Sequence, residues 1–127
     1  MKLLNIEKII EIYKKLITAY GGSYGVRDLK LLESAIDKAF ITFDGKELYE
    51  DVYLKISVIT YSIISNHSMI DGNKRLGIAV MLILLEINGV NVEYTQDELI
   101  NLGMSIAKNE YKEDDIKNWI IKHRINS

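Results

Sequence analysis

The chain contains no cysteine and no proline among its 127 residues. Without cysteine it can form neither a disulfide nor a thiolate metal site, which is typical of a cytoplasmic protein. It also lacks a basic excess: the net charge of -2 argues against a protein that binds nucleic acid through bulk electrostatics. Its longest apolar run is shorter than the roughly 20 residues that cross a bilayer. We therefore expect a cytoplasmic protein with no membrane partner and no direct nucleic-acid partner.

No repeat and no low-complexity tract marks a domain boundary. The charges spaced through the first 16 residues do not fit a signal peptide. Hydrophobic residues make up 48% of the chain, an ordinary share for a globular protein, and the length suits one domain with a real core. We expect a single domain over residues 1–127.

Hydrophobic spacing predicts an all-α fold. Apolar residues recur at three- or four-residue spacing in about six segments, at 6–20, 28–39, 48–65 (with residue 50 as an alternative start), 73–88, 95–108 and 112–124. Asn5 and Asp28 are expected to cap the first two helices, and Thr95 and Glu98 to form a capping box on the fifth. Because residues 76–87 are apolar all round, we expect helix 73–88 to be buried on all sides at the centre of the domain.

One segment is expected to be extended. Residues 41–43 favour extended backbone, and Asp44-Gly45 is a strong turn signal, so residues 40–47 predict a short hairpin-like flap. Other conspicuous residues receive ordinary interpretations. His123 is expected to be a solvated cation on the last helix, and Trp119 a core anchor. The tyrosines at 20, 24 and 49 fit half-buried positions better than a binding groove.

The nine residues from His67 to Arg75 concentrate the polar chemistry. They lead into the central helix, whose first amides have no partner within the helix and attract anions together with its dipole. Gly72 allows a ligand to approach the backbone, and Lys74 and Arg75 add two cations suited to phosphate. Cations are unfavourable at a helix N-terminus, so their placement indicates a bound polyphosphate.

Two further groups suggest a reaction. Asp71 beside a phosphate cradle is the kind of carboxylate that holds Mg²⁺ together with substrate phosphates. His67 can accept a proton from an attacking hydroxyl. The set is typical of transfer of a phosphorus-containing group from a nucleotide to a hydroxyl. Taken singly, Asp71 could be a helix cap, Gly72 a turn, His67 a helix end and the two cations a solvated pair; their coincidence favours a site.

The segment HSMIDGNKR resembles the signature of the Fic/Doc superfamily in its Doc (death-on-curing) branch, which has phenylalanine two residues after the histidine. The resemblance extends to YGVRDLKLLESAI and TFDGKELYEDVYLKISVITYSII and covers about residues 5–90. It implies a compact Fic-like helical domain. By position it implies ATP and Mg²⁺ as cofactors. His67 would be the catalytic base, and Asp71 would bind the metal. Gly72 and Asn73 would form the anion hole, and Lys74 and Arg75 would be catalytic groups that grip the phosphates.

Lys74 distinguishes the branches. Fic proteins that transfer AMP have glycine there and a second arginine where this chain has Ile78. The Doc pattern implies a reversed nucleotide and an ATP-dependent protein kinase that modifies a threonine of translation elongation factor Tu and so arrests translation. It also implies a toxin paired with an antitoxin whose disordered tail folds onto it. The flap near 40–46 would align the target peptide, by strand addition in one interpretation.

Two departures from the motif concern its loop. Met69 replaces the phenylalanine and Ser68 a frequent proline, and neither change removes a reactive group. No serine or threonine has glutamate four residues later, so the self-inhibitory segment of many Fic proteins is absent and restraint must come from a partner. Two alternatives stay open: a Fic-type AMP transferase acting on a protein hydroxyl, and a non-catalytic Doc-like binding module.

Overall fold

The computed structural model describes residues 1–125 and is built almost entirely of α-helices. Its elements, in chain order, are α1 (Ile6–Tyr20), α2 (Leu29–Asp37), the 3₁₀ turn η1 (Lys38–Phe40), β1 (Thr42–Phe43), β2 (Lys46–Glu47), α3 (Val52–Asn66), α4 (Asn73–Ile87), α5 (Gln96–Ala107) and α6 (Glu113–His123). The predicted all-α fold is confirmed. Among residues 1–125, none of the helices combines the length and the apolar character needed to cross a membrane.

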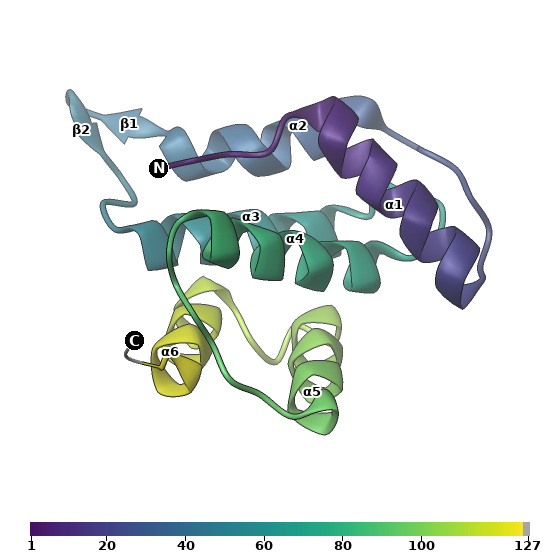
Figure 1. Cartoon of the computed structure of the whole chain (residues 1–127). Coiled ribbons are helices and arrows are strands. Elements are labelled where there is room, and N and C mark those ends of the chain that lie inside the picture. The colour runs from purple at the N-terminus through teal and green to yellow at the C-terminus, as the bar shows by residue number, and fades with distance from the viewer. Residues whose placement is uncertain (126–127) are drawn as a thin grey trace.

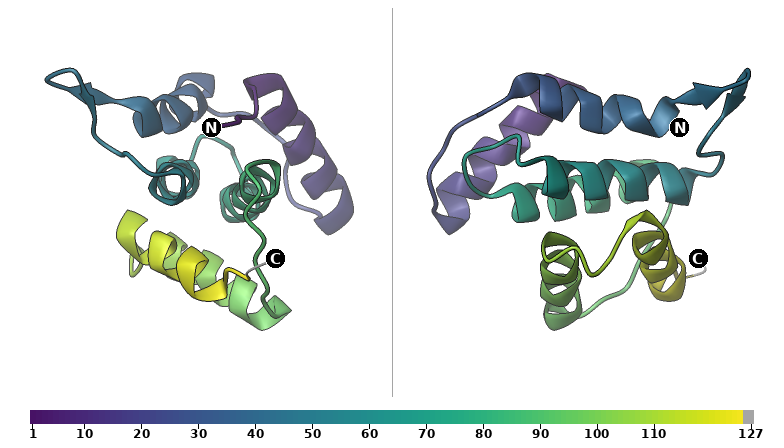
Figure 2. Two further views of the ribbon diagram at one scale, coloured as in Figure 1. Left: turned by 60° about the vertical axis from the view of Figure 1, so that its left-hand side comes forward. Right: turned by 180° about the vertical axis from the view of Figure 1, so that it is seen from behind.

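The helices form three layers in the order of the chain. Figure 1 shows α1 and α2 on one side, α3 and α4 in the middle, and α5 and α6 on the other side. In the left view of Figure 2, α3 and α4 are seen nearly end-on between the two outer layers. The two middle helices pack most extensively on each other, so the loop that joins them, residues 67–72, is anchored in the core of the molecule.

The predicted helix starts are confirmed by their caps. Asn5 accepts a hydrogen bond from the amide of Lys8, and Asp28 accepts from two amides of α2. Thr95 and Glu98 form the expected capping box. The third helix starts slightly later than the predicted residue 48 or 50, because the carboxylate of Asp51 caps it by accepting a hydrogen bond from the amide of Leu54 at 2.7 Å. Residues 48–51 instead lead out of the hairpin.

Helix α4 supplies the centre of the hydrophobic core, as predicted. Its side chains with less than one-tenth exposure are Leu76, Ile78, Val80, Met81, Leu84 and Leu85. It packs against α3, α5 and α1. These helices leave one stripe less covered, and Ala79, Leu82 and Ile83 are only half-buried. The prediction that this helix is buried on all sides is therefore too strong.

The predicted hairpin is confirmed. Thr42 pairs with Glu47 and Phe43 with Lys46, and the turn residues Asp44 and Gly45 have φ of 52° and 77°. Two successive positive φ values suit the Asp-Gly turn of a tight hairpin. The hairpin projects from the molecule beside the start of α3, at the opposite end from the loop that follows α3 (Figure 1).

The last helix corrects one prediction. The ring of His123 stacks on Trp119 with centroids 3.9 Å apart, and its Nε2 lies 2.7 Å from the carboxylate of Glu98. Its Nδ1 lies 2.7 Å from the carbonyl oxygen of Trp119. His123 is therefore not a solvated cation but a bridge between α6 and α5. Trp119 is buried, as predicted.

This bridge makes a pH-dependent prediction. The hydrogen bond to His123, followed by those to Thr95, lowers the pKa of Glu98 from 4.5 to about 2. Because the pKa is lower in the folded state, the stability that Glu98 contributes is present above about pH 4.5 and is lost as the pH falls towards 2. A carboxyl NMR titration should find this low pKa in the native protein and a value closer to 4.5 in His123→Ala. An ordinary pKa in the unsubstituted protein would contradict the bridge.

Candidate functional site

The site begins where α3 ends. His67 is the C-cap of α3 and has a left-handed backbone, with φ 52° and ψ 46°. A residue other than glycine in this conformation costs about 1–2 kcal/mol, so surrounding contacts must hold it. One such contact is a hydrogen bond from the guanidinium of Arg27 to the carbonyl oxygen of His67. The imidazole itself is exposed. His67 is thus a helix end, one of its two interpretations, and also presents a free side chain.

The loop after His67 is fixed by the segment before α2. The carbonyl oxygen of Ser68 accepts hydrogen bonds from the amides of Arg27 at 2.8 Å and Asp28 at 2.9 Å. Met69 forms an isolated antiparallel bridge with Val26. Met69 is only 1% exposed and belongs to the core, so it anchors the loop as the phenylalanine of the motif would.

Asn73 closes the loop from the other side. Its side-chain oxygen accepts a hydrogen bond from the amide of Met69, and its side-chain nitrogen donates to the carbonyl of Met69, both at 3.0 Å. The side-chain amide of Asn73 therefore pairs with both the backbone N–H and the carbonyl group of Met69. The structure gives Asn73 a positioning role: it holds the loop against the first turn of α4.

Asp71 lies at the mouth of the loop and is not the cap of α4. One carboxylate oxygen accepts a hydrogen bond from the amide of Ser23 at 3.1 Å, and the other from the amide of Gly72 at 2.9 Å. Its own carbonyl accepts a 2.7 Å hydrogen bond from the hydroxyl of Tyr13, a fully buried residue of α1. Helix α1 and the turn after it therefore hold Asp71 in place.

The N-terminus of α4 is open. Gly72 is its N-cap, with φ 82°, and among residues 1–125 no side chain caps the helix. A Cβ on Gly72 would lie 3.3 Å from Ile17 and 3.4 Å from Tyr13, so the positive φ and the tight fit both favour glycine. An uncapped helix N-terminus presents amide donors and a partial positive charge to a ligand.

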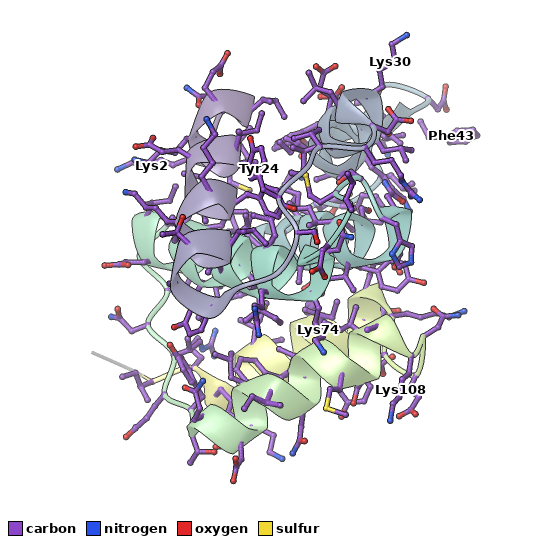
Figure 3. All side chains as sticks on the ribbon, turned by 90° about the vertical axis from the view of Figure 1, so that its right-hand side faces the viewer. Lys2, Tyr24, Lys30, Phe43, Lys74 and Lys108 are labelled. Carbon is purple, nitrogen blue, oxygen red and sulfur yellow. The ribbon has the colours of Figure 1, made fainter. Side chains whose placement is uncertain are left out.

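A cleft of about 550 Å³ opens at this N-terminus. All six residues predicted to form the site line it: His67, Asp71, Gly72, Asn73, Lys74 and Arg75. Lys74 extends between the middle layer and α5 (Figure 3). Arg75 lies over the ring of Tyr20 at 5.3 Å, and its Nη1 makes long hydrogen bonds of 3.4 and 3.5 Å to the carbonyls of Tyr20 and Gly21. Such weak contacts leave its other donors available for a ligand.

The remaining walls were not predicted. They come from the end of α1 and its turn (Tyr20, Gly21, Gly22), from Ile64 and Ile70, and from Ala107 of α5. In the sequence, Gly21-Gly22 indicates only the end of a helix. A Cβ on Gly22 would lie 2.7 Å from a carboxylate oxygen of Asp71, so this glycine permits the close approach of the turn to the site. Tyr20 lines the cleft, which is the less favoured of its two interpretations.

The hairpin, which the resemblance expects to align the target peptide, lies away from the cleft. None of residues 40–47 lines the cleft. Helix α3 separates the two, and its 15 residues span about 22 Å. A peptide that added a strand to the hairpin would therefore not place its side chains at His67 directly.

The donor set at the cleft fits Mg²⁺ bound with phosphates. Within residues 1–125 no cluster of three or more histidine, aspartate or glutamate side chains can hold a metal by itself. Asp71 is the one acidic residue among those that line the cleft. Mg²⁺ commonly binds through one or two carboxylates together with substrate phosphates and water, so a single carboxylate beside an anion-attracting helix end suits it.

Comparisons with known proteins identify the family of the chain. Residues 3–85 match the model of the Fic/DOC family, a segment that includes α1 to α3, the loop and most of α4. The chain is also 32% identical over 100 residues to Toxin Doc of Mycolicibacterium smegmatis (strain ATCC 700084 / mc(2)155), a match that covers 77% of each chain. The matched family segment contains every residue predicted for the site. The chain belongs to the Fic/DOC family, in its Doc branch.

Proposed function

We propose that this chain is the toxin of a toxin–antitoxin pair and an enzyme that transfers the γ-phosphoryl group of ATP to a protein hydroxyl. The observation that carries the proposal is the cleft at the open N-terminus of α4, which His67, Lys74 and Arg75 all line. The similarity to a protein named Toxin Doc supports the toxin assignment.

In the proposed phosphoryl transfer each residue has a distinct role. The oxygen of the acceptor hydroxyl attacks the γ-phosphorus, the bond from that phosphorus to the bridging oxygen breaks, and ADP leaves. His67, exposed and fixed by its backbone, accepts the hydroxyl proton. Lys74, Arg75 and the free amides of α4 bind the phosphate oxygens and stabilise the charge that builds on them.

Asp71 would hold Mg²⁺ against the phosphates. The ion would supply positive charge that neutralises part of the negative charge of the phosphates. The chain prepares the carboxylate for this role by fixing it from two sides, through the amides of Ser23 and Gly72. Tyr13 contributes by holding the carbonyl of the same residue.

The cations that line the cleft support transfer of the γ-phosphoryl group rather than of AMP. Lys74 occupies the position that is glycine in AMP-transferring Fic proteins. Ile78, at the position of their second arginine, is buried against the core and cannot grip a phosphate. The positive charge is therefore confined to the first turn of α4, which favours a nucleotide with its terminal phosphates there.

The proposed target is a threonine of translation elongation factor Tu, and the proposed partner is an antitoxin with a disordered tail, both in the cytoplasm. These follow from membership of the Doc branch and from the resemblance of the motif.

The test uses ATP labelled at either the γ- or the α-phosphate, incubated with Mg²⁺, this protein and bacterial elongation factor Tu. We expect label on the factor from the γ-position only. Label from the α-position would instead support the AMP-transferase alternative. If neither label reaches the factor although ATP binds, the target or the catalytic function is wrong.

A further inference from the structure

Arg27 contacts the catalytic loop twice, through different groups. Its guanidinium donates to the carbonyl oxygen of His67, and its backbone amide donates to the carbonyl oxygen of Ser68 at 2.8 Å. Two successive peptide units of the loop are therefore held by one residue. Neither interaction involves the cleft itself, because Arg27 is not among the residues that line it.

The backbone on both sides of Arg27 is itself held by hydrogen bonds. The next residue, Asp28, caps α2 by accepting hydrogen bonds from the amides of Lys30 and Leu31 at 3.0 and 3.3 Å. On the other side, the carbonyl of Gly25 accepts a hydrogen bond from the amide of Ile70 at 2.9 Å. The segment 25–28 is thus a rigid support laid against loop residues 68–70, and the side chain of Arg27 extends that support to residue 67.

His67 needs this support more than its neighbours do. It has a left-handed backbone, which a residue with a side chain rarely adopts, and it follows the last turn of α3, where carbonyl groups have no partner within the helix. A change in its φ or ψ would move the imidazole away from the position it now holds at the cleft. A charged donor makes a stronger hydrogen bond to a carbonyl than a neutral one, so a guanidinium suits the task.

We infer that Arg27 is a positioning residue, which fixes the backbone of His67 so that the imidazole is presented to the cleft. This inference rests on the proposed function for its kinetic consequence. Arg27 would act on the chemical step through His67 and leave nucleotide binding, which belongs to α4, unchanged.

Arg27→Met tests the inference, because it keeps the backbone amide and the length of the side chain but removes the guanidinium. Misplacement of a reacting group by about 1 Å can cost about 100-fold in rate, so we expect kcat to fall by about 10- to 100-fold. The KM for ATP should stay close to that of the unsubstituted protein. Arg27→Lys, which keeps a cationic donor, should restore part of the rate, and so should methylguanidine added to Arg27→Met.

The matched control is Arg124→Met. Arg124 also donates one hydrogen bond, at 2.8 Å, to an oxygen of a neighbouring element, the hydroxyl of Tyr53, and it also is exposed. It lies outside the cleft, so its loss should leave kcat unchanged and methylguanidine should have no effect. A rate in Arg27→Met equal to that of Arg124→Met would overturn the inference.

A second readout does not depend on the acceptor. The chain has two histidines, so the ring resonances of His67 can be assigned by comparison with His67→Ala. In protein without nucleotide, we expect Arg27→Met to broaden or split these resonances while those of His123 stay in place. Unchanged His67 resonances would overturn the positioning role, whether or not the proposed phosphoryl transfer is found. Changed resonances without transfer in the unsubstituted protein would leave the positioning role intact and reject the proposed function alone.

Discussion

Replacing His67 by alanine is expected to slow phosphoryl transfer by about 10²- to 10⁴-fold, the range that a positioned general base contributes. The binding of ATP should change little, because the cations and amides that would bind its phosphates belong to α4. Single-turnover transfer of γ-label to elongation factor Tu measures the first quantity, and titration calorimetry with ATP and Mg²⁺ measures the second. Expression of the variant should also be tolerated by cells, whereas the proposed function expects the unsubstituted chain to arrest them.

The control for this prediction is His123→Ala. His123 is the other histidine of the chain and bridges Glu98 and Trp119, away from the cleft. Its loss should lower stability and leave the rate of transfer unchanged in protein that remains folded. Equal rates for His67→Ala and the unsubstituted protein would show that His67 is not the base. Equal toxicity of His67→Ala and the unsubstituted protein would favour the non-catalytic binding module.

The largest effect on stability is expected from Gly77→Ala, in the middle of α4. A Cβ there would lie 2.4 and 2.9 Å from side-chain carbons of Ile64 and 3.3 Å from the carbonyl oxygen of Thr60, both on α3. Overpacking of this kind costs about 1–3 kcal/mol, and the better helix propensity of alanine returns up to about 1 kcal/mol. We therefore expect a lower free energy of unfolding, measured in urea. Activity should fall as well, because α3 and α4 carry the loop between them.

The same substitution at Gly103 provides the comparison. Gly103 is also buried in a helix, but a Cβ there would meet the flexible stem of Lys74 at 3.1 Å and Ile78 at 3.4 Å. The stem can move, so Gly103→Ala should be close to neutral or stabilising. If Gly77→Ala is as stable as Gly103→Ala, the close approach of α3 and α4 is not what glycine serves at position 77.

Local signals in the sequence predict the secondary structure of this chain well. Asn5, Asp28 and Thr95 each accept the backbone hydrogen bonds expected of a cap, and Asp44-Gly45 forms the expected turn. These features depend on residues within a few positions of one another. The start of α3 differs from the predicted residue 48 or 50 by a few residues, because the capping carboxylate is that of Asp51.

The polar groups of the site were also predictable, because the motif is continuous in sequence. The residues that hold these groups in place were not predictable. Tyr13, Ser23 and Arg27 hold the loop from segments that lie at least 40 residues away along the chain. No local pattern reports such contacts. The same reason explains His123: its pairing with Glu98 depends on how α6 docks on α5, 25 residues apart in sequence.

The position of the hairpin shows a further limit. Its turn and register follow from the sequence, but its distance from the site follows from the length of α3, which carries the chain away from the hairpin before His67 is reached. How an acceptor protein is oriented at the cleft is therefore to be sought among the residues around the cleft mouth rather than in residues 40–47.

In the proposed reaction, the open N-terminus of α4 binds the phosphates of a nucleotide. The most direct test is a two-dimensional amide NMR titration with ATP and Mg²⁺, which needs no acceptor protein. We expect the largest shifts on the amides of residues 72–75 and weaker binding in Lys74→Ala. Shifts concentrated instead at the cleft between α5 and α6, where Glu98 and His123 lie, or no shifts at millimolar ATP, would contradict it.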